Sequence, residues 1–226
     1  MTSRTDTMTS RPALDLSLYL VTDTELCGGR QGLLDTVAAA VAGGVTAVQL
    51  RDPQAGTPEL VALGRALQEV LAEAGVPLIV NDRADVAVAI GAAGVHVGQH
   101  DLPPEAARAM VGDRAYVGLS VQTVGHVDAV RALPPGTVDY LGVGPVFPQR
   151  TKTDAAAPGG LDVLTEIVGT AALPCVAIGG ITVDNAMAAR ATGVHGIAVV
   201  SAICGQDDPG RTARALRHRF RDQEVG

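Results

Sequence analysis

The sequence predicts an α/β protein folded as a single (β/α)8 barrel, the TIM-barrel architecture, with its active site at the C-terminal ends of the strands. From Leu18 onward, eight short apolar, β-branched runs alternate with Ala-, Leu- and Val-rich amphipathic segments. Such runs are typical of parallel strands covered by helices, and the alternation indicates right-handed crossovers. The unit repeats at roughly 25 residues, which fits a barrel near its lower size limit. An open doubly wound sheet is the alternative, but the GxGxxG turn typical of that fold does not follow the first run.

The expected elements follow in order along the chain. The strands are Leu18–Val21, Thr46–Leu50, Leu78–Val80, Val95–Val97, Tyr116–Leu119, Tyr140–Val143, Val176–Ile178 and Gly196–Val200. Between them, amphipathic segments predict helices at Leu33–Ala42, Pro58–Ala74, Pro103–Val111, Thr123–Leu133, Leu161–Gly169 and Val183–Ala191.

Composition excludes several classes of protein. Of the 226 residues, 47% are hydrophobic, which provides enough apolar surface to offset the entropy of ordering and excludes a disordered chain. The 17 basic and 24 acidic residues give a net charge of −7 with no dense basic block, so no nucleic-acid partner is expected. The longest uncharged stretch, Ile167–Val183, contains Pro and Gly and is shorter than the ~20 apolar residues of a membrane helix. No membrane partner is expected either.

The chain divides into a tail and one domain. Residues 1–17 are polar and lack the apolar core of a secretory signal, so we expect a flexible N-terminal tail before a catalytic barrel over residues 18–220. Cys27, Cys175 and Cys204 have neither CxxC nor metal-site spacing, which is typical of a reduced, cytoplasmic protein.

Polar, charged or glycine residues follow every expected strand. In strand order these exits are Thr22-Asp23, Arg51-Asp52, Asn81-Asp82, Gly98-Gln99-His100-Asp101, Ser120, Gly144-Pro145, Gly179-Gly180 and Ser201. The strand starts follow only Gly, Pro or small residues. Because a barrel brings all strand exits to one rim, we expect the chemistry to lie there.

Two acids and two cations among these residues indicate a metal and diphosphate site. Asp82 and Asp101 follow neighbouring strands, and carboxylates without cysteine suit Mg²⁺, which takes further oxygens from a substrate phosphate. Arg51 stands at the rim, and Lys152 lies in a long connection over residues 144–158 that is typical of a lid. The alternative is that each aspartate caps the segment after it and that Lys152 is simply solvated.

A second anion site is indicated at the last two exits. Gly179-Gly180 allows backbone N–H groups to approach a ligand, and Ser201 adds a hydroxyl where many barrels bind phosphate. The alternative for the glycine pair is a tight turn. Two anion sites on one rim indicate two phosphorylated substrates, or one with two phosphate ends. His96 lies within a strand and is expected to be buried and hydrogen-bonded rather than to act as a base.

Seven phrases together resemble the thiamine-phosphate synthase family over nearly the whole chain, from Leu18 to about Arg219. They are YLVTD (Tyr19–Asp23), VQLRD (Val48–Asp52), NDRADVAVAIGAAGVHVGQHDLP (Asn81–Pro103), DYLGVGPVF (Asp139–Phe147), TKTDAAAPGGL (Thr151–Leu161), AIGGIT (Ala177–Thr182) and AVVSAI (Ala198–Ile203). The resemblance implies a transferase that joins 4-amino-2-methyl-5-(diphosphooxymethyl)pyrimidine to a thiazole phosphate and releases thiamine phosphate and diphosphate.

The resemblance also implies roles for individual residues. Asp82 and Asp101 would hold the Mg²⁺ cofactor, and Arg51, Lys152 and Ser120 would be catalytic. The implied pyrimidine diphosphate-binding residues are Gln49, Leu50, Arg51, Asp52, Pro53, Asn81, Ser120 and Lys152. The implied thiazole phosphate-binding residues are Gln149, Arg150, Thr151, Gly180, Val200 and Ser201. The implied substitution is dissociative and needs no protein nucleophile, because Mg²⁺ and the cations take up the charge on the leaving diphosphate.

Three positions depart from the family pattern. Pro53 stands where many members have lysine, Gln149 where the loop often has threonine, and Gln122 where histidine is common. Arg150 is a candidate to replace the missing charge. Two alternatives stay open. One is a thiazole tautomerase on the same scaffold, which relies on the histidine absent at Gln122; the other is a non-catalytic thiamine-phosphate-binding protein, favoured by Pro53 and Gln149. The sequence leaves open whether the chain forms a homo-oligomer.

Overall fold

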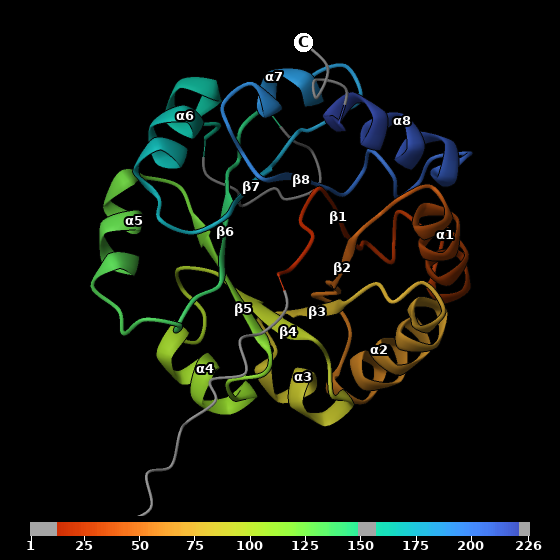
Figure 1. Cartoon of the computed structure of the whole chain (residues 1–226). Helices are drawn as coiled ribbons and strands as arrows, with labels where there is room; N and C mark the ends of the chain where they lie inside the picture. Colours follow the sequence, from red (N-terminus) through yellow and green to blue (C-terminus); the bar gives the residue numbers. More distant parts are fainter. Residues whose placement is uncertain (1–12, 149–156, 222–226) are drawn as a thin grey trace, which may run out of the picture.

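The computed structural model describes residues 13–148 and 157–221, which form a closed barrel of eight parallel strands. The strands pair in chain order, and β1 closes the barrel against β8 (Figure 1). They are β1 (Leu18–Val21), β2 (Ala47–Leu50), β3 (Leu78–Asn81), β4 (Gly94–Val97), β5 (Tyr116–Val121), β6 (Tyr140–Val143), β7 (Cys175–Ile178) and β8 (Gly196–Val199). The predicted (β/α)8 fold is confirmed.

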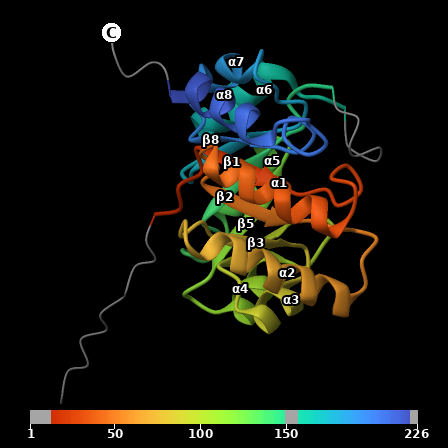
Figure 2. The same cartoon turned by 90° about the vertical axis from the view of Figure 1, so that its right-hand side faces the viewer.

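Helices alternate with the strands and form an outer ring around them (Figures 1 and 2). Within the described residues they are α1 (Arg30–Ala42), α2 (Thr57–Ala72), α3 (Ala84–Ile90), α4 (Pro104–Val111), α5 (Val124–Arg131), α6 (Gly160–Thr170), α7 (Ala186–Arg190) and α8 (Pro209–Arg221). The sequence did not indicate α3 or α8, because α3 has only 7 residues and α8 is rich in arginine and polar residues. Among the described residues, no helix has the length and hydrophobicity that a membrane span requires.

Side chains alternate along each strand between two apolar layers, as the period of two in a strand requires. In β1, Leu18 and Leu20 pack in the layer between the barrel and its helices, whereas Tyr19 and Val21 belong to a second cluster inside the barrel. Polar residues take interior positions in the same alternation near the C-terminal ends of the strands. These residues are Gln49, Asn81, His96 and Ser120, whose strand neighbours pack in the outer layer.

The opposite end of the barrel is closed by residues just before β1. Leu16 is buried and joins the interior cluster, and Asp15 pairs with Arg217 of α8 at 3.4 Å. A Cβ on Gly196 would lie 1.7 Å from the Leu16 carbonyl oxygen, so β8 must begin with glycine for this approach. Contacts with the barrel therefore begin upstream of Leu18, and residues 1–12 of the expected tail lie outside the described residues.

Candidate active site

Arg51 stands at the end of β2, where the backbone is held by the neighbouring strand. The fully buried Thr22 hydroxyl, at the end of β1, accepts a hydrogen bond from Arg51 N at 3.0 Å and donates to Arg51 O at 3.3 Å. The Arg51 residue is half-buried, and among the described residues no hydrogen bond or ion pair involves its guanidinium. A fixed backbone with an unpaired guanidinium at the rim suits an anionic ligand.

Asp82, at the end of β3, has an unusual backbone conformation. Its φ of 58° is the only positive φ at a non-glycine among the described residues. Its N–H donates to His96 O at 2.8 Å, which links β3 to β4, and Asn81 Nδ2 donates to its Oδ2 at 2.6 Å. Left-handed backbone costs an L-residue roughly 1 kcal/mol or more and is found preferentially at functional sites. The position of this carboxylate is therefore held by its surroundings.

Asp101 follows β4 and is fixed by the start of its own loop. Its Oδ2 accepts a hydrogen bond from Gly98 N at 2.9 Å. A Cβ at position 98 would lie 2.6 Å from the same oxygen, so only glycine allows this approach. Asp101 is exposed in the loop after β4, and β4 pairs with β3, the strand that Asp82 follows.

The donor set fits Mg²⁺ held by a pair of carboxylates. Within residues 13–148 and 157–221, no group of three or more His, Cys, Asp or Glu could hold a metal ion. Mg²⁺ is commonly held by one or two carboxylates, with waters and substrate phosphates completing its shell. Asp82 and Asp101 with the neighbouring Asn81 amide offer hard oxygen ligands, which suit Mg²⁺ better than a soft metal.

A chain of hydrogen bonds crosses the barrel interior beneath this rim. Gln49 Nε2 donates to the Tyr19 hydroxyl at 3.0 Å, and the Tyr19 and Tyr140 hydroxyls lie 2.9 Å apart. The Tyr140 hydroxyl lies 3.1 Å from His96 Nδ1, and His96 Nε2 lies 3.0 Å from Ser120 Oγ. The chain joins side chains of β1, β2, β4, β5 and β6, and it ends at two residues of the expected pyrimidine diphosphate site.

His96 is buried with a hydrogen-bond partner on each ring nitrogen, as the sequence predicted. Burial lowers the pKa of its imidazole to about 4, and the charge of Asp101 opposes this only in part. His96 is therefore neutral at neutral pH. A neutral ring carries one N–H, so one of its nitrogens donates and the other accepts.

This burial predicts that the protein loses stability as the pH falls. In the unfolded chain the His96 pKa is near 6.5, whereas folding lowers it to about 4, so the unfolded state binds more protons between these values. We expect His96 to reduce the free energy of unfolding by about 2 kcal/mol between pH 7 and pH 5, measured by urea denaturation. The loss of unfolding free energy between pH 7 and pH 5 should be smaller by that amount in His96→Asn. Equal losses in the wild type and His96→Asn would contradict the prediction.

Gly179 and Gly180, after β7, form a turn that only glycine fits. Their φ values are 98° and 65°, and a Cβ on Gly180 would lie 2.5 Å from the Pro148 carbonyl oxygen. Among the described residues, no hydrogen bond involves the N–H groups of Gly180 or Ser201. Ser201 is exposed at the end of β8, next to this turn, because β7 pairs with β8. The tight turn thus leaves N–H donors and a hydroxyl at adjacent exits, which suits a phosphate group.

The side chains of four other expected site residues pack in the protein, stabilise a turn or face solvent. The Leu50 side chain is buried in the layer between strands and helices, so only its backbone lies on the site side. An Asp52 carboxylate oxygen accepts from Gln54 N at 3.2 Å and stabilises the local turn. Pro53 is exposed, and half-buried Val200 packs against the interior cluster.

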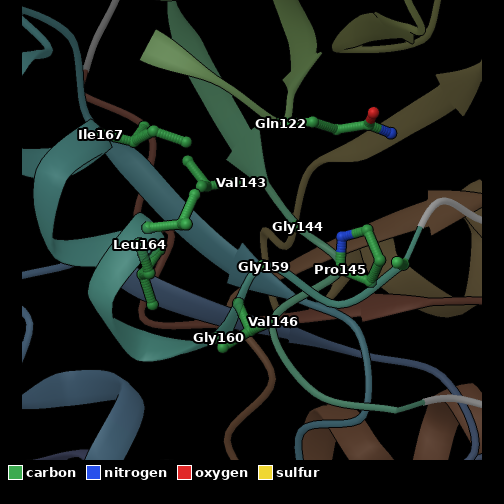
Figure 3. Close-up of a pocket in the computed structure, with 11 residues that line it drawn as sticks. Gln122, Val143, Gly144, Pro145, Val146, Gly159, Gly160, Leu164 and Ile167 are labelled. Carbon is green, nitrogen blue, oxygen red and sulfur yellow. The ribbon is translucent and has the colours of Figure 1, made fainter.

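Four expected site residues, Gln149, Arg150, Thr151 and Lys152, lie outside the described residues, and their roles stay predictions. A cavity of about 40 Å³ lies between β6 and α6 (Figure 3). Val143, Leu164 and Ile167 line it on the apolar side, and Gln122 lies at its edge. Ligand pockets usually measure about 300–1,000 Å³, so this cavity does not hold either substrate.

Three residues that support the site were given no role from the sequence, although Gln99 was named among the residues that follow the strands. Tyr19 and Tyr140 lie in the hydrogen-bond chain, and Gln99 Nε2 donates to Ser120 O at 2.6 Å. Strand alternation would place both tyrosines inside a barrel, since each lies next to outward-facing residues. Their pairing across the barrel, between β1 and β6, leaves no local signal in the sequence.

Comparisons with known proteins show one family over most of the chain. The family model described as thiamine monophosphate synthase matches residues 18–203. The chain is 49% identical over 203 residues to a thiamine-phosphate synthase of Laribacter hongkongensis, covering 90% of this chain and 94% of that one. It is 51% identical over 204 residues to a thiamine-phosphate synthase of Xanthobacter autotrophicus, with the same coverage. The solved thiamine phosphate pyrophosphorylase from Pyrococcus furiosus matches with a TM-score of 0.82 and 37% identity, covering 92% of this chain and 96% of that one.

Proposed function

Because this chain belongs to the thiamine monophosphate synthase family, we propose that it joins 4-amino-2-methyl-5-(diphosphooxymethyl)pyrimidine to a thiazole phosphate. The products are thiamine phosphate and diphosphate. Membership of this family makes the chain a transferase. We propose three further points: the two substrates named above, a Mg²⁺ cofactor and a dissociative substitution.

One observation supports the proposal: two sets of residues suited to phosphorylated ligands follow the strands at one rim of the barrel. The first set is Arg51 after β2, Asp82 after β3 and Asp101 in the loop after β4. The second set is Gly180 after β7 and Ser201 after β8. The first set suits a metal-bound diphosphate, and the second suits a single phosphate. A reaction between two phosphorylated molecules needs such a pair of sites facing one space.

The first set would hold and activate the pyrimidine diphosphate. Asp82 and Asp101 are the residues that would bind Mg²⁺, which when bound neutralises negative charge on the diphosphate and so favours its departure. Arg51, which follows the neighbouring strand β2, would add a permanent positive charge, and its hydrogen bonds would strengthen as the leaving group gains charge. Gln49 and Ser120, at the two ends of the interior chain, would orient the pyrimidine from below.

The second set would hold the nucleophilic substrate. Bound through its phosphate at Gly180 and Ser201, the thiazole would present its ring nitrogen to the methylene carbon that loses the diphosphate. Positioning of this kind replaces a collision between two dissolved molecules and supplies much of the rate. No protein atom has to form a covalent bond with either substrate, so the site needs no nucleophilic side chain.

A coupled assay tests this function. The purified chain is incubated with both substrates and Mg²⁺, and diphosphate and thiamine phosphate are measured together. We expect both products in equal amounts with Mg²⁺ and neither once EDTA has removed the metal. Tight binding of thiamine phosphate without diphosphate release would instead indicate the binding protein, and isomerisation of a thiazole carboxylate would indicate the tautomerase.

A further inference from the structure

The barrel interior is shaped to hold the His96 ring against Tyr140. A Cβ on Gly118 would lie 2.4 Å from His96 Nδ1 and 2.5 Å from the Tyr140 hydroxyl oxygen. A Cβ on Gly142 would lie 3.0 Å from His96 Cε1. These two glycines of β5 and β6 leave the space that the imidazole and its hydrogen bonds occupy, so any larger residue would displace the ring.

In the row of hydrogen bonds from Gln49 to Ser120, only one assignment of donors and acceptors satisfies every group. Gln49 Nε2 carries only donors, so the Tyr19 oxygen accepts from it. The Tyr19 hydroxyl is buried and its proton needs an acceptor, and its other described partner is the Tyr140 oxygen. The Tyr140 proton is then donated to its remaining partner, His96 Nδ1. In neutral His96 the proton must therefore sit on Nε2, from which it is donated to Ser120 Oγ.

We propose that Tyr19, Tyr140 and His96 are positioning residues that hold His96 in the Nε2–H tautomer and so present the Ser120 hydroxyl as a hydrogen-bond donor to substrate. Ser120 accepts from His96, which leaves its own proton for an acceptor atom at the site, such as a ring nitrogen or a phosphate oxygen. At the other end, Gln49 uses its amide nitrogen in the chain and keeps its amide oxygen as an acceptor. The substrate part of this inference rests on the proposed function; the tautomer does not.

The backbone of Ser120 is fixed independently of its side chain. Gln99 Nε2 donates to Ser120 O at 2.6 Å, and β5 pairs with both β4 and β6. Because the backbone is fixed, the hydrogen bond from His96 determines only the direction in which the Ser120 hydroxyl proton points. An imidazole that donated from Nδ1 would reverse that rotation and turn Ser120 into a donor to His96.

Nitrogen NMR of the protein labelled with ¹⁵N-histidine tests the tautomer without any activity. We expect His96 to show an unprotonated Nδ1 and a protonated Nε2 at pH 7, with the resonance assigned by its loss in His96→Gln. The Tyr140→Phe variant removes only the hydroxyl that fixes Nδ1 as the acceptor, and it should shift the His96 signals toward the other tautomer. A protonated Nδ1 in the wild type would overturn the proposal.

Kinetics test the consequence for Ser120. Tyr140→Phe should lower kcat/KM for the pyrimidine diphosphate about tenfold, the effect of one misdirected hydrogen bond, and leave KM for the thiazole phosphate unchanged. Tyr116→Phe is the matched control, because Tyr116 also lies at an interior position but at the opposite end of the barrel from Ser120. It should leave both constants unchanged.

Adding Tyr19→Phe to Tyr140→Phe should lower kcat/KM little further, because Tyr140→Phe already breaks the row of hydrogen bonds. Additive losses, or an equal loss in Tyr116→Phe, would show a general packing effect and overturn the positioning role. If the wild type shows no synthase activity, the proposed function fails, and the NMR result still decides the tautomer.

Discussion

Replacing Asp82 by asparagine is expected to lower the rate measured with Mg²⁺ by at least about 100-fold, since the proposed role of Asp82 is to bind the metal, and a bound metal ion stabilises the reacting charge by several kcal/mol. The change removes the charge and keeps the size of the side chain. Asparagine adopts left-handed backbone as readily as aspartate, so the φ of 58° is no obstacle to folding. The expected loss is therefore chemical rather than structural.

Steady-state rates measured across a Mg²⁺ titration check this expectation, together with thermal unfolding of the same sample. Asp85→Asn is the matched control, because Asp85 is an exposed aspartate three positions along the chain that pairs with Arg83 at 2.6 Å. The control should keep the wild-type rate and Mg²⁺ dependence. A full rate in Asp82→Asn, or one that no longer depends on metal while remaining high, would show that Asp82 is only a structural residue.

Replacing Arg51 by methionine is expected to lower kcat about 100- to 1,000-fold, as the removal of one preorganised charge-stabilising donor does in other enzymes. Methionine keeps the unbranched shape but has no charge and no donors. The backbone bonds of Arg51 with Thr22 do not involve the side chain, so the rim should keep its shape. Arg51→Lys should recover part of the rate, because lysine restores the charge without the planar set of donors.

Single-turnover measurement of diphosphate release separates this effect from substrate binding. KM for the thiazole phosphate should stay at the wild-type value, since that substrate would bind at β7 and β8. Arg83→Met serves as control, because the guanidinium of Arg83, the residue before α3, is bound to Asp85 and Thr57. If Arg51→Met and Arg83→Met reduce the rate equally, Arg51 has no special place in the reaction.

The predictions from sequence were accurate where one local signal was enough. Each apolar run that predicted a strand is a strand, because full burial on both sides requires continuous apolar residues. Helix α8 was not indicated, since its arginine-rich sequence masks the few residues, such as Leu216 and Phe220, that it buries. The family resemblance assigned Leu50 to the site, but strand alternation turns its side chain toward the helices.

By itself, the sequence determined the barrel, the family and the rim on which the polar residues lie, because parallel strands place every exit at the same end. Only the tertiary structure decided how those residues are held. Asp82, in left-handed backbone, donates its N–H to His96 O of the next strand, and the two tyrosines meet across the barrel from β1 and β6. Such contacts join residues that are far apart in the chain, so no local pattern of side chains encodes them, and they form only when the barrel closes.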